Sequence, residues 1–524
     1  MNLFDKTIAA VSPNRALKRI EARKKLKLLN QGYGDHGANT RKKSMLGWFA
    51  KSGSVLEDIE HNIPKLRERS RDLYMGAPLA TGALKTIRTN VVGSGLKLNS
   101  QIDYEYLGMT LEEADAWETT VEREFNLWAE SVHCDAQRMN NFYELQQLAF
   151  LGQLMSGDSF ALLPVIPRPN IPYDIRVQII ESDRVCTPDK KKFNTDNKII
   201  NGVEVNFRGE VVAYHIAQNH PNSISLKRND WTRVKKFGAN TGRPNVIHLM
   251  ESERPEQRRG VPILAPVIES LKQLARYSEA ELMAAVVSGM YTVFIKSENP
   301  QNEQPGQYFD EYDDQIEEDD TNYELGNGAI VALGENESIQ DSNPGRPNQA
   351  FDGFVTAICR QIGSALEVPY ELLLKHFTAS YSASRAALLE AWKMFRMRRS
   401  WLASDFCQPI YEEFLAEAVA KGRINAPGFF TDPVARKAYC TAEWNGPSQG
   451  QIDPLKEVKA AAQRVNEGFS TRTRETVELG NGDFFRNTRL RMVEERLRQE
   501  GGLIPNENST LEEEPEPGGG EEGK

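Results

Sequence analysis

The chain has 524 residues, a length that predicts two to four structural units instead of one ordinary core. Its 40% hydrophobic and 26% charged residues are typical of a folded chain and exclude wholesale disorder. The net charge of −10 argues against a protein that coats nucleic acid, because such a protein needs a basic surface to displace counterions from phosphate. A protein past which DNA slides without being gripped remains compatible with this charge.

The five cysteines lie far apart, and no two have the spacing of metal ligands or of a redox pair. This pattern predicts a reducing compartment and small buried side chains instead of disulfides or zinc ligands. The residues are Cys134, Cys186, Cys359, Cys407 and Cys440.

The first 51 residues contain 12 Lys and Arg against 3 Asp and Glu, a local charge of +9 in an acidic chain. They form either a solvated arm or an arm that touches nucleic acid or an acidic partner. We expect no secretion signal here, since no apolar core is followed by a cleavage site. The stretch GYGDHG at 32–37 matches the dinucleotide fingerprint formally, but a Lys-rich helical pattern precedes it instead of a strand, so no cofactor site is predicted.

Residues 64–250 alternate between helical and extended patterns and predict an α+β unit. Helical periodicity covers 64–93, 111–130 and 142–155, with an extended segment at 94–100. Strands are predicted at 159–166 and 175–181, and 202–216 alternates about Arg208–Gly209 as a hairpin.

A long helix is predicted from Pro262, since a proline in the first turn loses no backbone hydrogen bond. The pattern extends over about 27 residues, or roughly 40 Å. Its apolar stripe comprises Ile263, Val267, Leu271, Leu274, Leu282 and Ala285. The uncharged run 282–295 falls short of the roughly 20 residues that span a bilayer, so we expect a buried helix followed by a strand.

Residues 297–348 are polar and rich in Asn, Pro and Gly, with a dense acidic run at 310–320. This run lacks the glycine and spaced ligands of a calcium loop, so we expect a solvated excursion, with one strand and a turn in 328–339. A second helix is predicted at 349–367, and Pro369 ends it.

A third helix is predicted from Ser384, after a connection of about 15 residues. Its apolar face comprises Leu388, Trp392, Phe395, Leu402 and Phe406. Lys393, Arg396, Arg398 and Arg399 fall on another face, which in a monomer we expect to be solvated. A smaller helical unit at 430–500 and a disordered acidic tail complete the prediction.

The sequence contains no HExxH, no Walker A loop, no nucleophile elbow and no metal-spaced Cys/His cluster. We therefore predict a structural or binding protein that is not an enzyme and holds no cofactor or metal.

Five segments, in matching order, resemble the lambda-type family of bacteriophage portal proteins. They are GALKTIRTNVVGSGLKL at 82–98, QIIESDRV at 178–185 with the hairpin that follows, RGVPILAPVIESLKQLARYSEAELMAA at 259–285, SYSASRAALLEAWKMFRMRRSWLA at 380–403 and WNGPSQGQIDPLKEVKAAAQRVNEGFST at 444–471. The third resembles the helix that opens the family's stem, and the fourth is the nearest single match.

The resemblance implies an α+β portal-type fold. It divides the chain into a basic N-terminal arm at 1–60, an α/β wing at 61–255 and 385–428, stem helices at 256–290 and 349–368, an inserted clip at 291–348, a tunnel loop at 369–384, a helical crown at 429–500 and a disordered acidic tail at 501–524.

The resemblance also implies a homo-oligomeric ring, typically a dodecamer, at one capsid vertex, where it is the channel for DNA packaging and ejection. The implied partners are double-stranded DNA, terminase, the major capsid protein and scaffold, and head–tail connector proteins. We expect the protein in the virion, and in the host cytoplasm during assembly. A head–tail adaptor ring and an unrecognised hydrolase or nuclease stay open as alternatives.

Two sets of site residues follow from this interpretation. Leu264, Leu271, Leu274 and Leu282 are expected to pack the stem against copies of itself. Lys375, His376, Thr378 and Ser380 are expected to face DNA as weak donors from the tunnel loop. Alternatively, Leu372, Leu373, Leu374 and Phe377 only pack this bend under the wing.

Overall fold

The computed structural model describes residues 10, 12–29, 42–188, 196–223, 230–289, 293–297, 337–341, 350–377, 380–450, 453–480 and 482–501. The chain divides into two compact units, Met1–Asp58 and Ile59–Lys524. The first contains helix α2 (Pro13–Leu29) and a short 3-10 turn, η2 (Lys43–Met45), and a π-helical turn, η3 (Leu56–Glu60), spans the boundary. Among the described residues, no helix combines the length and the apolar character needed to cross a membrane.

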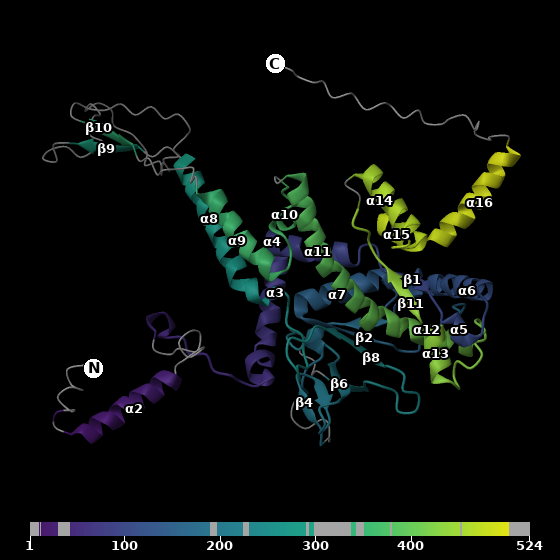
Figure 1. Cartoon of the computed structure of the whole chain (residues 1–524), viewed down its shortest axis with the longest axis horizontal. Coiled ribbons are helices and arrows are strands. Elements are labelled where there is room, and N and C mark those ends of the chain that lie inside the picture. The colour runs from purple at the N-terminus through teal and green to yellow at the C-terminus, as the bar shows by residue number, and fades with distance from the viewer. Residues whose placement is uncertain are drawn as a thin grey trace, which may run out of the picture. The chain divides into compact units, whose positions relative to one another are not determined.

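The second unit begins with helices that the sequence predicted well (Figure 1). They are α3 (Ile63–Gly76), α4 (Pro78–Val91), α5 (Tyr104–Leu107), α6 (Leu111–Ala129) and α7 (Phe142–Ser156). Capping boxes start α6 at Thr110 and α7 at Asn141, where a glutamate three residues on bonds back to the cap N–H. The helices predicted at 111–130 and 142–155 are therefore confirmed to within one residue.

Three antiparallel sheets accompany these helices. The first has the order β3–β2–β8 and is made of β2 (Asp158–Leu162), β3 (Gln178–Ile180) and β8 (Val246–Met250). The second has the order β4–β5–β6–β7 and is made of β4 (Lys198–Ile200), β5 (Val203–Val205), β6 (Val211–Ala217) and β7 (Trp231–Lys235). The β5–β6 pairing confirms the predicted hairpin, and Gly209 adopts the positive φ of +81° that its turn requires.

The third sheet joins distant parts of the chain. Its strands β1 (Lys97–Ser100) and β11 (Ala442–Asn445) pair in antiparallel register, with Leu98 opposite Trp444. No local sequence pattern predicted this pairing.

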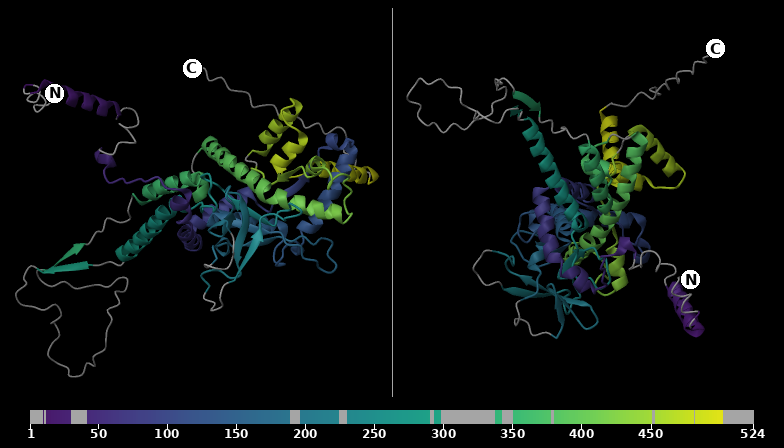
Figure 2. Two further views of the ribbon diagram at one scale, coloured as in Figure 1. Left: turned by 90° about the horizontal axis from the view of Figure 1, so that it is seen from below. Right: turned by 90° about the vertical axis from the view of Figure 1, so that its left-hand side faces the viewer.

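The predicted stem helix is a 3-10 turn, η6 (Ala265–Val267), followed by α8 (Ile268–Gly289), so the regular helix is shorter than the expected 27 residues. Helix α9 (Phe351–Ala365) lies beside α8 in both Figure 1 and Figure 2. Between them, β9 (Val293–Ser297) pairs with β10 (Glu337–Asp341). The acidic run at 310–320 and most of the strand predicted at 328–339 lie outside the described residues.

The remaining elements are helical apart from β11. They are α10 (Tyr370–Leu374), α11 (Tyr381–Leu402), the π-helical η7 (Ala403–Cys407), α12 (Gln408–Ala420), α13 (Pro433–Tyr439), α14 (Pro454–Asn466), α15 (Arg472–Gly480) and α16 (Phe484–Glu500). The acidic tail beyond residue 501 lies outside the described residues.

The main core forms where α12 packs against α6 and α7. The ring of Phe125 on α6 contacts Phe142, Tyr411 and Phe414 edge-on, at centroid distances of 5.2 to 5.7 Å. Aromatic rings favour this arrangement because the positive edge of one ring meets the negative face of another. The core thus joins segments almost 300 residues apart.

Replacing Phe125 by Ala removes the ring at the centre of this cluster and leaves a cavity. We expect the free energy of unfolding to fall by about 3–5 kcal/mol. Chemical denaturation of Phe125→Ala and of the control Leu127→Ala, an exposed position on the same helix, measures the difference. Equal stability of the two variants would contradict this view of the core.

Candidate functional site

The four leucines predicted to pack the stem have different environments. Leu264, Leu271 and Leu274 are buried by the chain itself. Leu282, two turns further along α8, is 65% exposed. The inner part of the predicted stripe is thus covered within one copy, whereas its outer part is not.

Aromatic contacts hold α8 against α9. The ring of Tyr277 on α8 stacks on Phe351 at 5.5 Å and meets Phe354 edge-on at 5.0 Å. Apolar side chains of both helices nevertheless remain open to solvent, Phe354 in part and those of α8 beyond this contact. We call Leu282, Met283, Val286 and Phe354 the outer stem residues, and each is about half exposed or more. Large exposed apolar side chains concentrated on one element commonly mark an interaction surface.

A buried ionic cluster fixes the segment that leads into α8. Arg259 donates from Nε to Asp158 Oδ2 at 2.6 Å, and Arg67 on α3 donates to Asp158 Oδ1 at 2.8 Å. The remaining Arg259 hydrogens bond to the carbonyl oxygens of Val185, Asn201 and Ser182. Burial raises the pKa of Asp158, but the guanidinium groups of Arg259 and Arg67 outweigh this effect and hold the pKa well below its ordinary value.

Two glycines allow this approach. A Cβ on Gly260 would lie 1.9 Å from the carbonyl oxygen of Gly157, which is closer than any side chain can approach a backbone atom. Gly157 itself adopts a φ of +90° after α7. The chain therefore enters α8 in direct backbone contact with the start of β2.

The bend between α9 and α11 has the predicted length of about 15 residues but begins and ends earlier, at 366–380. It contains the helical turn α10, and α11 begins at Tyr381, three residues before the predicted Ser384. The sequence misplaced these limits because Ser, Thr and Tyr are weak helix formers, whereas packing of α10 and α11 on α4 supports them.

The predicted DNA-facing residues lie on this bend. Lys375 has a φ of +54° at the end of α10, and its side chain, like those of His376 and Ser380, is exposed. Thr378 lies outside the described residues. Leu373 is buried and Phe377 is half exposed, so the leucines pack the bend while the polar residues remain accessible.

The expectation of a solvated basic face on α11 is wrong for two of its four residues. Arg398 is buried, and it donates from NH1 to Glu251 Oε2 at 2.9 Å. Arg399 is half-buried, and its hydrogen bonds within the described ranges all go to backbone carbonyl oxygens. Lys393 and Arg396 are exposed as expected. Helical spacing alone could not show this, because the partners lie on α4, just after β8 and just after β11, all distant in sequence from most of α11.

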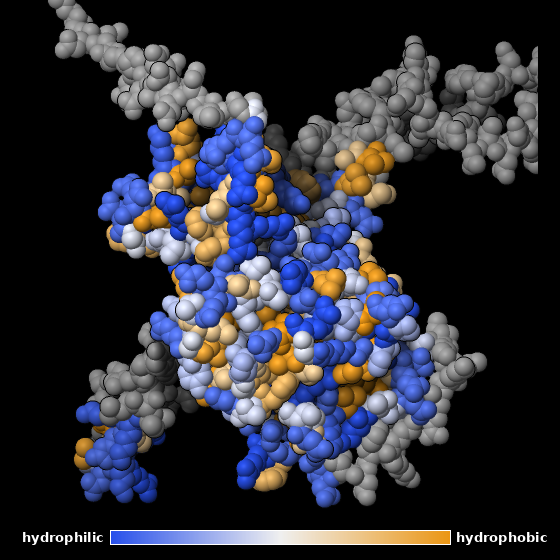
Figure 3. All heavy atoms as spheres, turned by 90° about the vertical axis from the view of Figure 1, so that its right-hand side faces the viewer, coloured by the Kyte–Doolittle hydropathy of each residue, from blue (hydrophilic) through white to orange (hydrophobic). Residues whose placement is uncertain are grey.

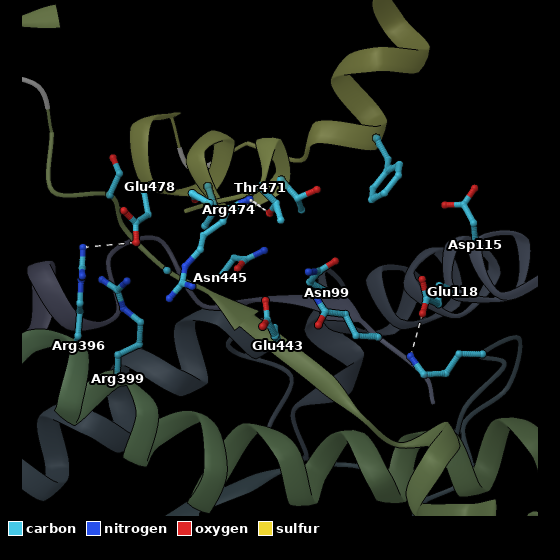
Figure 4. A pocket seen from close by; sticks show the side chains of 18 of the residues that line it. Asn99, Asp115, Glu118, Arg396, Arg399, Glu443, Asn445, Thr471, Arg474 and Glu478 are labelled. Atoms are coloured by element: carbon cyan, nitrogen blue, oxygen red, sulfur yellow. Dashed lines mark hydrogen bonds and ion pairs between the residues drawn. The ribbon is translucent and has the colours of Figure 1, made fainter. Parts of the chain in front are cut away.

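A cavity of about 1200 Å³ lies between α6, α11, the β1–β11 pair and the C-terminal helices. Figure 4 shows Arg396 and Arg399 at one end, Arg474 and Glu478 above, Asn99, Glu443 and Asn445 below, and Asp115 and Glu118 at the other end. A second cavity of about 820 Å³ adjoins it between α6 and α16.

Two glutamates of α6 in these cavities bind the backbone near β1. Glu122 accepts from the Ser100 N–H at 2.9 Å, and Glu118 accepts from the Ile102 N–H at 2.8 Å. Burial, with a smaller contribution from the charges of Asp483 and Glu118, raises the pKa of Glu122 to about 7. The sequence analysis did not single out these glutamates, because the backbone that they bind is brought to α6 only by the fold.

One group of potential metal ligands lies elsewhere in the described part of the chain. Ligand atoms of Glu181, Asp183 and His220 lie within 4.8 Å of one another. Asp183 already pairs with Arg67, Arg71 and His220, so cationic side chains occupy its oxygens. This arrangement resembles an ion-pair network more than a metal centre.

The chain is similar to known proteins over most of its length. The family described as "Phage portal protein, lambda family" matches residues 41–399. Portal protein B of Escherichia phage lambda is 24% identical over 91% of this chain and 92% of its own length. The portal protein of Escherichia phage N15 is 25% identical over 90% of this chain and 91% of its own length.

Among solved structures, a chain from the neck of a native gene transfer agent (GTA) particle computed with C12 symmetry is 14% identical, with a TM-score of 0.41, over 79% of this chain and 92% of that chain.

The raised pKa of Glu122 predicts a pH dependence of stability. A carboxyl whose folded pKa is raised contributes stability below its unfolded value of 4.5, and this contribution is lost as the pH rises through about 7. Glu122→Gln keeps the acceptor for Ser100 but cannot ionise. We therefore expect the stability of the wild type, relative to this variant, to fall between pH 5 and pH 8.5.

Denaturation midpoints at several pH values test this expectation, with Glu112→Gln, an exposed position on the same helix, as the control. A constant difference between wild type and Glu122→Gln across the range would show that Glu122 does not titrate there.

Proposed function

Because the chain belongs to the lambda family of phage portal proteins, we propose that its copies assemble into a closed ring, with twelve as the expected number, at one vertex of a phage capsid. DNA enters the head through the central channel during packaging and leaves through it at infection. In this ring, α8 and α9 form the stem, 291–348 the clip, the bend before α11 the tunnel loop, and 429–500 the crown.

The outer stem residues carry this proposal. A single copy leaves Leu282, Met283, Val286 and Phe354 largely in water, although the same stripe of α8 is buried nearer its base. Burial of apolar surface contributes about 25 cal/mol per Å², so a neighbouring copy that covers these side chains stabilises the assembly. In a ring, each copy presents one side of its stem to the next copy. Because the ring is closed, every copy has two neighbours, and none keeps this apolar surface in solvent.

The charge of the chain suits a channel. A wall with many phosphate contacts would retain DNA, since each neutralised phosphate adds to the affinity. The chain is acidic overall, and the bend offers only Lys375, His376 and Ser380 as exposed donors among its described residues. We infer that these side chains touch passing phosphates weakly and transiently.

The partners follow from the position of such a ring. We propose that terminase docks on it during packaging and that head–tail connector proteins replace terminase afterwards, with the clip as their contact. The wing contacts the major capsid protein and scaffold. The role is structural, without catalysis by this chain, in the virion and, during assembly, in the host cytoplasm.

Leu282→Asp should prevent ring formation without unfolding the chain. Its charge would be buried between copies at a cost of several kcal/mol, yet it is solvated in the single copy. Sedimentation velocity should show wild-type particles of roughly 0.7 MDa if twelve copies of the 59.1 kDa chain assemble, and small species for the variant.

Leu271→Asp is the contrasting variant, because Leu271 is buried within the chain and its replacement should lower the thermal unfolding temperature itself. Normal rings from Leu282→Asp would show that α8 does not lie between copies.

Lys375→Glu, alone or with His376→Ala, should leave rings intact and reduce the amount of DNA packaged or retained. Both side chains are exposed, so their replacement removes phosphate contacts without disturbing the core. In vitro packaging followed by nuclease protection measures this. Lys393→Glu, an exposed lysine on α11, is the control. If heads made with the Lys375 variants package and retain as much DNA as the wild type, Lys375 and His376 do not contact the passing DNA.

A further inference from the structure

The C-terminal helices α14, α15 and α16 are attached to the rest of the second unit by few buried side chains. Of the described residues in these three helices, only Ala461 of α14 and Glu475 of α15 are buried, and no residue of α16 is buried. Apolar side chains of these helices, such as Leu455 on α14 and Met492 on α16, are open to solvent, and Figure 3 shows apolar surface of this kind among polar residues. Hydrophobic packing alone therefore does not fix their position.

The ion pairs between these helices and the rest of the second unit lie at the surface, with Glu457 the most covered of the partners. Arg385 on α11 faces Glu457 at 3.7 Å, and Arg396 faces Glu478 at 3.7 Å across the edge of the large cavity. Arg489 on α16 pairs with Asp115 on α6 at 2.6 Å. Exposed pairs contribute about 0–1 kcal/mol each and are screened by salt, so they hold the helices weakly.

Arg399 is different, because its guanidinium group connects three segments. Its Nε donates to the carbonyl oxygen of Val91 at 3.0 Å, and its NH2 donates to those of Asn90 at 2.9 Å and Pro447 at 2.8 Å. Val91 is the last residue of α4, and Pro447 lies in the segment that leads from β11 to α14. Arg399 on α11 thus bonds to α4 and also to the segment that leads to the C-terminal helices.

The surroundings of Arg399 are shaped for a guanidinium group. No ion pair joins it to a carboxylate within the described ranges, and burial lowers its pKa to about 10, with a further contribution from Arg396. The carbonyl end of α4 supplies the compensating negative potential. The group also lies over the ring of Trp392 at 5.5 Å, a cation–π contact.

Gly446 provides the space that this arrangement needs. A Cβ at position 446 would lie 2.6 Å from Nε of Arg399 and 2.7 Å from a methyl carbon of Leu96. The guanidinium therefore rests directly on the backbone just before Pro447. A lysine could place one charge near α4, but its single ammonium lacks the planar fork that reaches both segments.

We propose that Arg399 is the joint that positions the C-terminal helices on α11 and α4. The helices and α11 then move as one body, and since α11 begins directly after the bend at Ser380, the joint also connects the crown with the DNA-facing bend. Without it, the C-terminal helices are held mainly by ion pairs at the surface and by few buried side chains, so their attachment depends on ionic strength. This assignment rests on contacts within one copy and is independent of ring formation.

Hydrogen–deuterium exchange of the full chain tests the joint in Arg399→Met and Arg399→Lys. Both should show exchange about tenfold faster at 454–500, since hydrogen bonds to a charged group contribute about 1.5–3 kcal/mol. The increase should be larger at 0.5 M NaCl than at 0.05 M. Exchange in α7 and α12 should be unchanged. Arg396→Met is the matched control one turn earlier, with a smaller increase that disappears at high salt.

Gly446→Ala is an independent test, because it displaces the guanidinium while keeping the arginine, and it should reproduce the effect of Arg399→Met. Normal exchange at 454–500 in Arg399→Lys would overturn the proposal, since a charge at the end of α4 would then suffice. Faster exchange confined to α4, or an equal rise throughout the chain, would likewise assign Arg399 a purely local structural role.

Discussion

Arg67, Asp158 and Arg259 come from three separate parts of the chain, and their buried ion pairs join the first helices, the central strand β2 and the entrance to α8. Removing one partner would leave a charge buried without compensation, so this contact permits little displacement. The direct contact between Gly157 and Gly260 imposes the same constraint on the backbone. The direction in which α8 leaves the β3–β2–β8 sheet and the helices around it follows from these two features, and with it the position of every surface that α8 presents.

The two ends of the second unit share one property. Apolar side chains are covered near the body and exposed away from it, both on α8 and on the C-terminal helices. In a single copy, this leaves apolar surface in water without a compensating contact. In the ring that we propose, a neighbouring copy would cover the exposed apolar surface of α8 and thereby remove this cost.

Local patterns in the sequence predicted elements whose packing is local. Helical spacing gave α6 and α7, and alternation about Arg208–Gly209 gave the β5–β6 hairpin. Features that join distant segments could not be predicted, among them the β1–β11 pairing and the backbone contacts of Glu118 and Glu122. Arg398 and Arg399 show the reason plainly: their spacing on a helix is that of a solvated face, and only the folded chain brings Glu251 and Pro447 against them. For the site, periodicity identified the apolar stripe of α8 but could not distinguish Leu271, covered by its own chain, from Leu282, which is exposed.

An electron cryo-microscopy map of the purified assembly would show whether the outer turns of α8 and α9 lie between copies of a ring. We expect a closed ring with a central channel in which Leu282, Met283, Val286 and Phe354 contact the neighbouring copy. A map that shows no closed ring, or a ring in which these side chains face solvent, would contradict it.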